Sequence, residues 1–229
     1  MGLFLEYSKN QDMTKRIQFP NEINPELLYF VGVIVGDGSL PIKHNGDNKR
    51  SFVITIEKAN EKFIVSVLKP LAERLFGVKW SITTRLREGR KQTWCLYLYS
   101  KAVYRFLVEK FDFSEGKKSG RIRMPLLVRN LKPRQRIPFI AGVMDTDWGV
   151  LGNGFGTHCS SRMLLVDVRD VLRNLLGINP KIKRYFQGKF VSYQMRLGVS
   201  QKAKLFNALE TYFPLRNHKR RLCFQCRGG

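Results

Sequence analysis

Two aspartates, Asp37 and Asp147, hold equivalent places in two similar segments of the chain. The first segment reads FVGVIVGDGS at residues 30–39, and the second reads IAGVMDTDWG at residues 140–149. If the fold brings the two carboxylates together, their charges repel each other, and a divalent cation relieves that repulsion. Mg²⁺ binds a few carboxylate and carbonyl oxygens and leaves its other positions to water and phosphate. Such a pair of acids therefore suits the hydrolysis of phosphodiesters.

The spacing of small residues in both segments predicts two helices that pack closely. Gly32 and Gly36 are four residues apart, so they lie on one helical face and leave it without side chains. Gly142 and Thr146 hold the corresponding places in the second segment. If these faces pack together, the acids that follow meet at the C-terminal ends of the helices, where the helix dipoles add further negative potential.

An internal repeat shows what must position these helices. Residues 63–78 and 163–178 are similar amphipathic segments, each with a glycine near its end, and they are predicted to be helices. The same offset of 100 residues relates 79–100 to 179–200, two alternating basic segments broken by a glycine and predicted to be β-hairpins. With helices predicted at 100–111 and 200–213, each half reads helix, strand, strand, helix, strand, strand, helix.

The starts of the two halves differ in length. Residues 40–57 form a long basic hairpin candidate in the first half, where the second half has only the glycine-rich stretch 150–157. A segment rich in Lys, Arg, Gly and Pro joins the halves, and no regular element is expected there. The predicted division is an N-terminal extension at 1–24, a first half at 25–112, a basic linker at 113–136, a second half at 137–213 and a basic tail at 214–229.

The charge of the chain indicates a polyanionic partner. Lys and Arg number 41 against 18 Asp and Glu, a formal net charge of +23, while 43% hydrophobic residues supply a core. The apolar run at residues 27–35 is too short to span a membrane, so no membrane partner is expected.

No secretory signal is recognised, so an intracellular protein is expected, with archaeal or bacterial cytoplasm and organelle left open. A Walker-type phosphate loop is missing, which argues against ATP-driven work.

The two motifs, the duplicated half and the linker before the second motif together resemble the LAGLIDADG homing endonuclease family in its monomeric, two-motif form. The resemblance extends from about residue 27 to residue 213. It implies an α+β fold of two pseudo-symmetric αββαββα halves, with the motif helices at their interface. Two antiparallel sheets would form a DNA-binding saddle. It also implies metal-dependent cleavage of both strands of a long DNA target across the minor groove.

The resemblance also implies roles for individual residues. Asp37 and Asp147 correspond to the catalytic, metal-binding acids, and the carbonyl groups of Gly36 and Thr146 are implied as further metal ligands. The family places basic residues near the metals, which points to Lys101, although its counterpart by offset is Gln201 with Lys202 beside it. Lys58 is a further basic candidate, and the offset of 100 sets Thr157 and His158 opposite Glu57 and Lys58.

The second motif departs from the family pattern at Trp148, where the first motif has Gly38. Glycine permits a tight turn out of the helix. Trp148 is expected to pack locally rather than to contact DNA, yet it could shift Asp147 and impair cleavage of a strand. Asp145 aligns with Val35 and is therefore expected to have a structural or capping role.

Strand alternation selects the residues that would face DNA. On each predicted hairpin, one face carries polar and basic side chains and the other carries apolar ones. The polar sets are Ser81, Thr83, Arg85 and Arg87 in the first half and Lys181, Lys183, Tyr185 and Gln187 in the second. The opposite faces carry residues expected to pack under helices: Ile82, Leu86, Ile182 and Phe186. Arg suits contacts with guanine and Gln contacts with adenine.

A second group of basic residues is predicted to contact phosphates. These residues lie at the tips of the hairpins, and each phosphate that they neutralise adds to the salt dependence of binding. They are Arg90, Lys91 and Lys189 in the two repeated hairpins, and Lys43, His44, Lys49 and Arg50 in the long hairpin of the first half.

The leading hypothesis is a site-specific endonuclease for double-stranded DNA, intron-encoded and monomeric, with a long pseudo-palindromic or asymmetric target. Mg²⁺ is the expected metal, and Mn²⁺ or Ca²⁺ would also occupy the site. The alternative is a maturase for intron RNA, or a cleavage-impaired DNA-binding protein or nickase, on the same fold. Retention of both acids favours the enzyme, whereas Trp148 and the mismatch between Lys101 and Gln201 favour the alternative.

Overall fold

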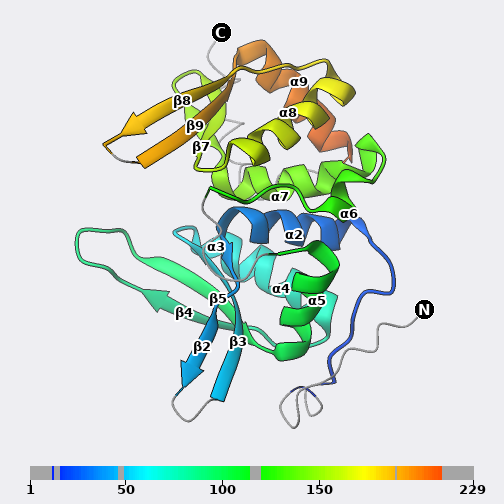
Figure 1. The fold of residues 1–229 in the computed structure, drawn as a ribbon, viewed down its shortest axis with the longest axis vertical. Helices are drawn as coiled ribbons and strands as arrows, with labels where there is room; N and C mark the ends of the chain where they lie inside the picture. Colours follow the sequence, from blue (N-terminus) through cyan, green and yellow to red (C-terminus); the bar gives the residue numbers. More distant parts are fainter. Residues whose placement is uncertain (1–11, 13–15, 46–48, 114–119, 189, 213–229) are drawn as a thin grey trace.

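The computed structural model describes residues 12, 16–45, 49–113, 120–188 and 190–212. Two halves of similar build lie on either side of a central pair of helices (Figure 1). The first half contains α2 (Pro25–Asp37), β1 (Gly38–Ser39), β2 (Ile42–Asn45), β3 (Lys49–Lys58), α3 (Glu61–Phe63) with a π-helical continuation (Ile64–Leu68), α4 (Lys69–Phe76), β4 (Ser81–Arg85), β5 (Thr93–Tyr99) and α5 (Lys101–Phe111).

The second half repeats this order without a counterpart of β2. It contains α7 (Ile137–Asp147), β6 (Gly149–Leu151), β7 (Gly154–Cys159), α8 (Arg162–Leu176), β8 (Ile182–Gln187), β9 (Phe190–Leu197) and α9 (Val199–Tyr212). Both sheets are antiparallel. The strand order is β1-β3-β5-β4 in the first, with β2 also paired to β3, and β6-β7-β9-β8 in the second. The predicted α+β architecture of two αββαββα halves is thereby confirmed.

Local sequence explains where the main helices begin and end. The side chain of Asn24 accepts a hydrogen bond of 2.8 Å from the backbone N–H of Leu27 and so caps α2. Ser100 caps α5 and Ser161 caps α8 in the same way. The repeated amphipathic helices end at Gly77 and Gly177, whose φ angles of 66° and 60° lie in the left-handed region that glycine adopts without strain.

The central pair, α2 and α7, packs backbone against backbone. A Cβ atom at Gly32 would lie 2.2 Å from the carbonyl oxygen of Phe139, and one at Gly142 would lie 2.1 Å from that of Tyr29. Every residue from Leu27 to Val35 is buried, because α2 contacts α7 on one side and its own sheet and helices on the other. This all-round burial explains why both motif helices are apolar on every face.

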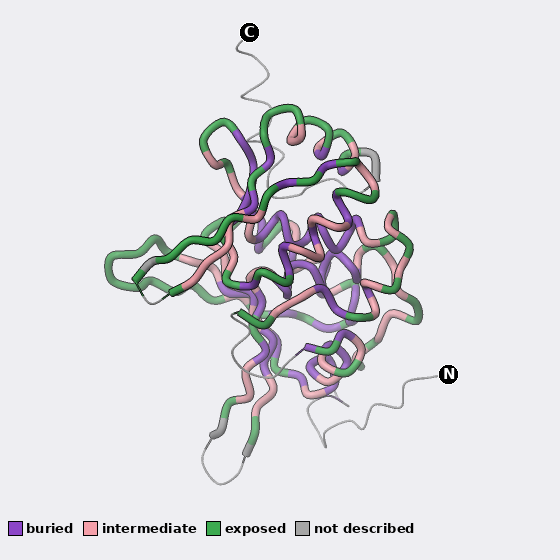
Figure 2. The backbone as a smooth tube through the Cα atoms, turned by 45° about the horizontal axis from the view of Figure 1, so that its top comes forward, coloured by how far each residue is buried: buried purple, intermediate pink, exposed green. Residues whose placement is uncertain are grey.

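Two hairpin arms, β4–β5 and β8–β9, project on the same side of the molecule (Figure 1). Exposed backbone continues along both arms in a second view, whereas buried backbone concentrates around the central helices (Figure 2). Ile82 and Ile182 pack against the core as predicted. The same prediction was wrong for Leu86 and Phe186, which are 77% and 66% exposed. Both lie where the arms extend beyond the described helices, so none of these helices covers the apolar face there.

The linker also differs from the prediction, because it contains short helices. α6 spans Leu126–Arg129, and a 3₁₀ turn spans Pro133–Arg136 directly before α7. Met124 and Val128 are buried, at 1% and 0% exposure. These apolar anchors supply the burial that holds an otherwise basic segment in place. Within the described ranges, no helix is both long and apolar enough to cross a membrane.

Replacing Gly142 by Ala should lower the free energy of unfolding by about 3 kcal/mol, because the new methyl group meets backbone that cannot rotate away. Urea unfolding followed by circular dichroism measures this change. Gly149→Ala is the matched control, since nothing lies within 4 Å of its Cβ position and its stability should stay within about 0.5 kcal/mol of wild type. Equal stability of the two variants would contradict backbone contact between α2 and α7.

Candidate active site

The two motif helices end in the same geometry. α2 ends at Asp37 and α7 ends at Asp147, and the next residue in each is extended, with φ −76° and ψ 159° at Gly38 and φ −98° and ψ 152° at Trp148. The backbone N–H of each of these residues donates to a carbonyl four residues earlier. The tryptophan therefore keeps the hydrogen bond that ends the helix, with a φ that is more negative than that of Gly38.

Glycine at position 38 permits the tight exit from the helix that was expected, for a steric reason. Its φ is ordinary, so no left-handed turn is needed; instead, a Cβ atom there would lie 2.6 Å from Cα of Ile34. Trp148 is 3% exposed, and its ring centroid lies 5.4 Å from that of Phe155. Its expected local packing is confirmed, and Asp147 remains at the end of α7.

The second acid lies against the end of the first motif helix. A Cβ atom at Gly36 would lie 2.0 Å from Oγ1 of Thr146 and 3.5 Å from the carboxyl carbon of Asp147. The carboxyl group of Asp147 thus lies across the interface, against the residue that precedes Asp37. The hydroxyl of Thr146 donates back to its own helix, 2.9 Å from the carbonyl oxygen of Val143.

Lys58 reaches this meeting point from the end of β3. Its ammonium group forms an ion pair with the carboxylate of Asp37 and donates a hydrogen bond to the carbonyl oxygen of Thr146. The side chains of Lys58 and Asp37 are 21% and 22% exposed, so the pair is largely screened from water. A positive charge is therefore held between an acid of one half and a carbonyl of the other.

These contacts bear on whether the site suits a divalent metal. Asp37, Asp147 and the backbone carbonyl of Thr146 offer hard oxygen donors, which Mg²⁺, Mn²⁺ and Ca²⁺ prefer. The ammonium of Lys58 already uses two of these oxygens as a cation would. Among the described residues there is no cluster of three or more His, Cys, Asp and Glu, so carbonyl oxygens, water and substrate must complete any coordination shell.

Strand register shows which residue of the second half corresponds to Lys58. Ser39 pairs with Thr55, and its counterpart Gly149 pairs with Gly156. Counting on from these pairs, His158 corresponds to Glu57 and Cys159 corresponds to Lys58. The constant offset of 100 was therefore wrong by one residue at this strand, a shift that moves a side chain to the other face of the sheet.

Burial confirms this corrected alignment. Thr157 is 2% exposed on the core face, as Ile56 is at 0% in the first half, while His158 is exposed. Burial raises the pKa of the Cys159 thiol, and the negative charge of Asp147 raises this pKa further. A neutral thiol thus lies near Asp147, where the first half places an ammonium group beside Asp37.

Lys101 does not join the acids. It begins α5, and its ammonium lies 5.9 Å from the ring centroid of Phe52. Phe52 is four residues from Ile56, the partner of Gly38, and four strand residues span about 13 Å. Lys101 instead lines a small polar cavity with Asp12, Arg50, Ser51, Phe52, Tyr99 and Ser100. The catalytic role of Lys101 stays a prediction, and the distance of Lys101 from the two acids gives it no support.

Asp145 has the structural role that was expected for it. Its carboxylate is fully buried and accepts a hydrogen bond of 2.7 Å from the hydroxyl of Tyr29 on the opposite helix. This bond joins the halves without facing the paired acids.

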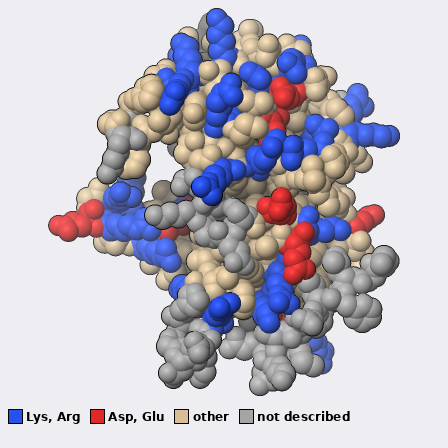
Figure 3. Space-filling view, viewed as in Figure 1, with Lys and Arg blue, Asp and Glu red and all other residues tan. Residues whose placement is uncertain are grey.

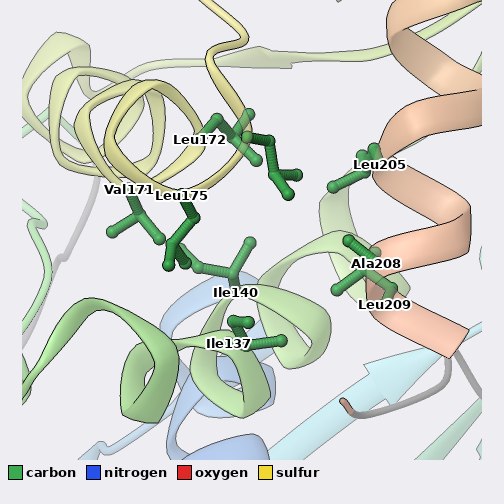
Figure 4. A pocket seen from close by; sticks show the side chains of 9 residues that line it. Ile137, Ile140, Val171, Leu172, Leu175, Leu205, Ala208 and Leu209 are labelled. Carbon is green, nitrogen blue, oxygen red and sulfur yellow. The ribbon is translucent and has the colours of Figure 1, made fainter. Parts of the chain in front are cut away.

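A separate crevice among α7, α8 and α9 is lined by apolar side chains and offers no reactive group (Figure 4). Its lining residues are Ile137, Ile140, Val171, Leu172, Leu175, Leu176, Leu205, Ala208 and Leu209.

The predicted DNA-facing residues of the first half whose side chains are described are exposed, and those of β4 share one face. Ser81, Thr83 and Arg85 belong to β4 and are exposed, and Arg87, Arg90 and Lys91 follow in the exposed loop. Lys43 and Arg50 are exposed on the β2–β3 hairpin, and Lys43 donates a hydrogen bond of 3.2 Å to the hydroxyl of Tyr99. Lys and Arg side chains greatly outnumber acids on the face shown in Figure 3.

The second arm presents a different set of groups. Lys181, Lys183 and Tyr185 are exposed, and the hydroxyl of Tyr185 donates to Oε1 of Gln194 at 3.1 Å. The amide nitrogen of Gln194 lies 2.8 Å from Nε2 of His158. Lys189 lies outside the described residues, and of His44, Lys49 and Gln187 only the backbone is described.

Sequence reasoning missed several polar residues on these faces, above all Glu57, Thr93, His158 and Gln194. Glu57 accepts hydrogen bonds from Arg85 and Thr93. All four residues lie on the inner strands of the two sheets, which are β3, β5, β7 and β9. Alternation of side chains along the inner strands, which selected the predicted DNA-facing residues on β4 and β8, also indicates these four residues.

No family model matches the sequence, and no curated protein matches it either. Solved structures do match in three dimensions. The homing endonuclease I-DmoI is 20% identical with a TM-score of 0.64, over 87% of this chain and 97% of that chain. I-WcaI is 17% identical with a TM-score of 0.59, over 93% and 90%. I-SmaMI is 14% identical with a TM-score of 0.57, over 90% of both chains. The fold predicted from the resemblance is confirmed.

The variant Lys58→Met should make the protein more dependent on metal for its stability. Without the ammonium group, two carboxylates remain close together, so stability in EDTA should fall by about 1–3 kcal/mol. Saturating Ca²⁺ should then stabilise the variant more than wild type, because the ion replaces the lost charge. Urea midpoints with Ca²⁺ or EDTA measure both effects.

Lys101→Met is the matched control for this test, since it removes the same charge away from the acids. It should gain no more stability from Ca²⁺ than wild type gains. An equal Ca²⁺ effect in wild type and Lys58→Met would contradict a shared cation position between Asp37 and Thr146.

Proposed function

We propose that this chain, which has the fold of the LAGLIDADG homing endonucleases, is a site-specific, metal-dependent endonuclease for double-stranded DNA. The observation that carries the proposal is the meeting of Asp37 and Asp147 at the touching ends of α2 and α7, between two basic arms. The two acids and the basic surface belong to one structure, so the group that hydrolyses a phosphodiester lies next to the surface that would hold the duplex.

The structural neighbours support this proposal through their described complexes. I-DmoI has been solved with DNA and Ca and with DNA and Mn, and a variant with target DNA and Mg. I-WcaI has been solved bound to its DNA recognition sequence. A double-stranded DNA partner and a divalent metal are therefore proposed for this chain, with Mg²⁺ as its metal on the basis of the hard oxygen donors.

The residues of this chain divide the work as follows. Asp37 and Asp147 would hold the metal, with carbonyl oxygens of Thr146 and Gly36 beside them. A bound divalent cation lowers the pKa of a water molecule and draws charge from phosphoryl oxygens. Lys58, displaced from its present contacts, would lie next to the scissile phosphate and offset its negative charge. The arms hold the duplex in register over the acids.

The same arrangement indicates how the protein engages its target. One chain supplies both halves and both acids, so we propose a monomer. The arms carry different side chains, which favours a long target whose two halves differ in sequence. Its DNA substrate requires the protein to act inside a cell or an organelle, and an intron origin is part of the same proposal. Intron RNA would be the partner if the chain were instead a maturase.

A second candidate, a nickase, rests on the pair Lys58 and Cys159. The first acid has an ammonium group beside it, whereas the corresponding residue near the second acid is a thiol whose pKa is raised by burial. The thiol is neutral at physiological pH and cannot offset charge on a phosphate. The observation that had favoured a nickase from sequence, Trp148, no longer does so, because α7 ends as α2 does.

The direct test of the function is to incubate the purified protein with a library of random and host-derived duplexes, with Mg²⁺ or with EDTA, and to sequence all cut ends. We expect double-strand breaks at one long site, with Mg²⁺ only. Tight binding without cuts would instead assign the chain to the maturase or DNA-binding class.

Asp37→Asn should reduce cleavage at that site by about 10³-fold or more, because the loss of a metal-binding carboxylate removes several kcal/mol of transition-state stabilisation. Affinity for the same duplex, measured by fluorescence anisotropy, should change little. Asp170→Asn removes an equal charge from the outer face of α8 and should cleave like wild type. Unimpaired cleavage by Asp37→Asn would exclude the proposed site.

The two strands should be cut at different rates, because Lys58 beside Asp37 corresponds to a thiol, Cys159, near Asp147, and burial raises the pKa of that thiol. On a supercoiled plasmid carrying the target, a nicked form should accumulate before the linear form. The first strand should be cut roughly ten times faster than the second. End-labelling each strand identifies the faster cut. Cys159→Lys should narrow this difference, whereas cuts of equal rate in wild type would show that Lys58 gives no advantage.

A further inference from the structure

Glu57 is a carboxylate on the face of the first sheet that would meet DNA. On β3, β5 and β4, residues that pair directly share a face: Glu57 pairs with Cys95, and Cys95 pairs with Thr83. Arg85 pairs with Thr93 two residues further along the same face. Glu57 therefore lies on the same face as the residues predicted to read bases, separated from those on β4 by the single strand β5.

The carboxylate binds both arginines of this face at once. Its oxygens lie 2.9 Å from a terminal nitrogen of Arg85 and 3.1 Å from one of Arg87. The hydroxyl of Thr93 donates to the same carboxylate at 2.7 Å and orients it. The side chain of Glu57 is 22% exposed, while those of Arg85 and Arg87 are 44% and 53% exposed. Each guanidinium thus keeps further N–H donors that face solvent.

The carboxylate of Glu57 weakens the electrostatic attraction of this face to DNA phosphates. In a chain with a net charge of +23, a carboxylate on the DNA side repels the backbone and ties up two cations that would otherwise contact phosphates. Ion pairs at this exposure add little to folding stability. A role in stabilising the fold or in holding the phosphate backbone therefore explains Glu57 poorly, and a role in aiming the two guanidinium groups explains it well.

The second arm supports the contrast. The residue corresponding to Glu57 is His158, whose ring contacts Tyr185 at a centroid distance of 5.6 Å and whose Nε2 lies 2.8 Å from the amide of Gln194. The described partners of His158 are thus a tyrosine and a glutamine, not arginines. A fixed carboxylate with two arginines is thus a feature of the first arm, and its effect on recognition should be confined to one half of the target.

We infer that Glu57 is a specificity-determining positioning residue, which holds Arg85 and Arg87 so that they read base edges instead of binding phosphates. Guanine is the base that a positioned arginine recognises, through its O6 and N7 atoms. The inference rests on the proposed function, since it presupposes a DNA target. It adds to that function a division of labour in which the first half-site is read by arginines with restricted geometry.

The test compares Glu57→Gln, Thr93→Val and wild type in binding selections from a randomised duplex library with Ca²⁺, which permits binding to be measured apart from cleavage. Glu57→Gln should lose about tenfold discrimination at a short block of base pairs in one half of the target, and none in the other half. Its affinity for random duplex should rise, and the slope of log affinity against log salt should steepen by about one to two. Thr93→Val should change discrimination in the same direction by a smaller factor.

Glu88→Gln is the matched control, because Glu88 is an exposed acid on the same hairpin and its loss frees no arginine of the pair. It should raise affinity slightly and leave discrimination and salt slope unchanged. If Glu57→Gln retains wild-type discrimination, or behaves as Glu88→Gln does, the inference fails while the endonuclease proposal stands. If wild type itself selects no sequence from the library, both fail together.

Discussion

Backbone contact between α2 and α7 determines where every other functional group of this protein lies. Gly32 and Gly142 let the two helices touch, and that contact brings Gly36 against Thr146 and Asp147 at the far end. Each acid is the last residue of its helix, so the distance between the acids follows from the packing of Gly32 and Gly142, each five residues, or about 1.4 turns, earlier. The sheets begin one or two residues later and carry the arms to the same side of the molecule (Figure 1).

This packing creates an electrostatic problem that each half solves differently. Two carboxylates and the negative ends of two helix dipoles meet at one point, and Lys58 neutralises part of that charge from the first half. Near the second acid, burial keeps the thiol of Cys159 protonated. The duplicated fold is thus symmetric in its backbone and asymmetric in its chemistry, and the same contrast recurs between Glu57 on one sheet and His158 on the other.

The sequence predicted what depends on period and repetition. The motif spacing identified the helix pair and its acids, and the offset between the halves identified the helices and hairpins, because both patterns are local. It failed where three-dimensional neighbours decide the outcome. The strand holding Cys159 is displaced by one residue relative to the first half, and only its pairing partner shows this. Alternation gave Leu86 and Phe186 a buried face, but no helix reaches far enough to cover them. The choice between Lys58 and Lys101 likewise depended on which strand end lies beside Asp37.

The central claim is that both acids and the carbonyl of Thr146 share one cation site at the helix interface. Anomalous diffraction from crystals of the protein with its target duplex and Mn²⁺ tests this claim most directly. The account predicts an anomalous peak within coordination distance of carboxylate oxygens of Asp37 and Asp147, with the ammonium of Lys58 moved away from the carbonyl of Thr146. Ordered duplex over the arms with no peak at these acids, and Lys58 still bridging Asp37 and the carbonyl of Thr146, would contradict it.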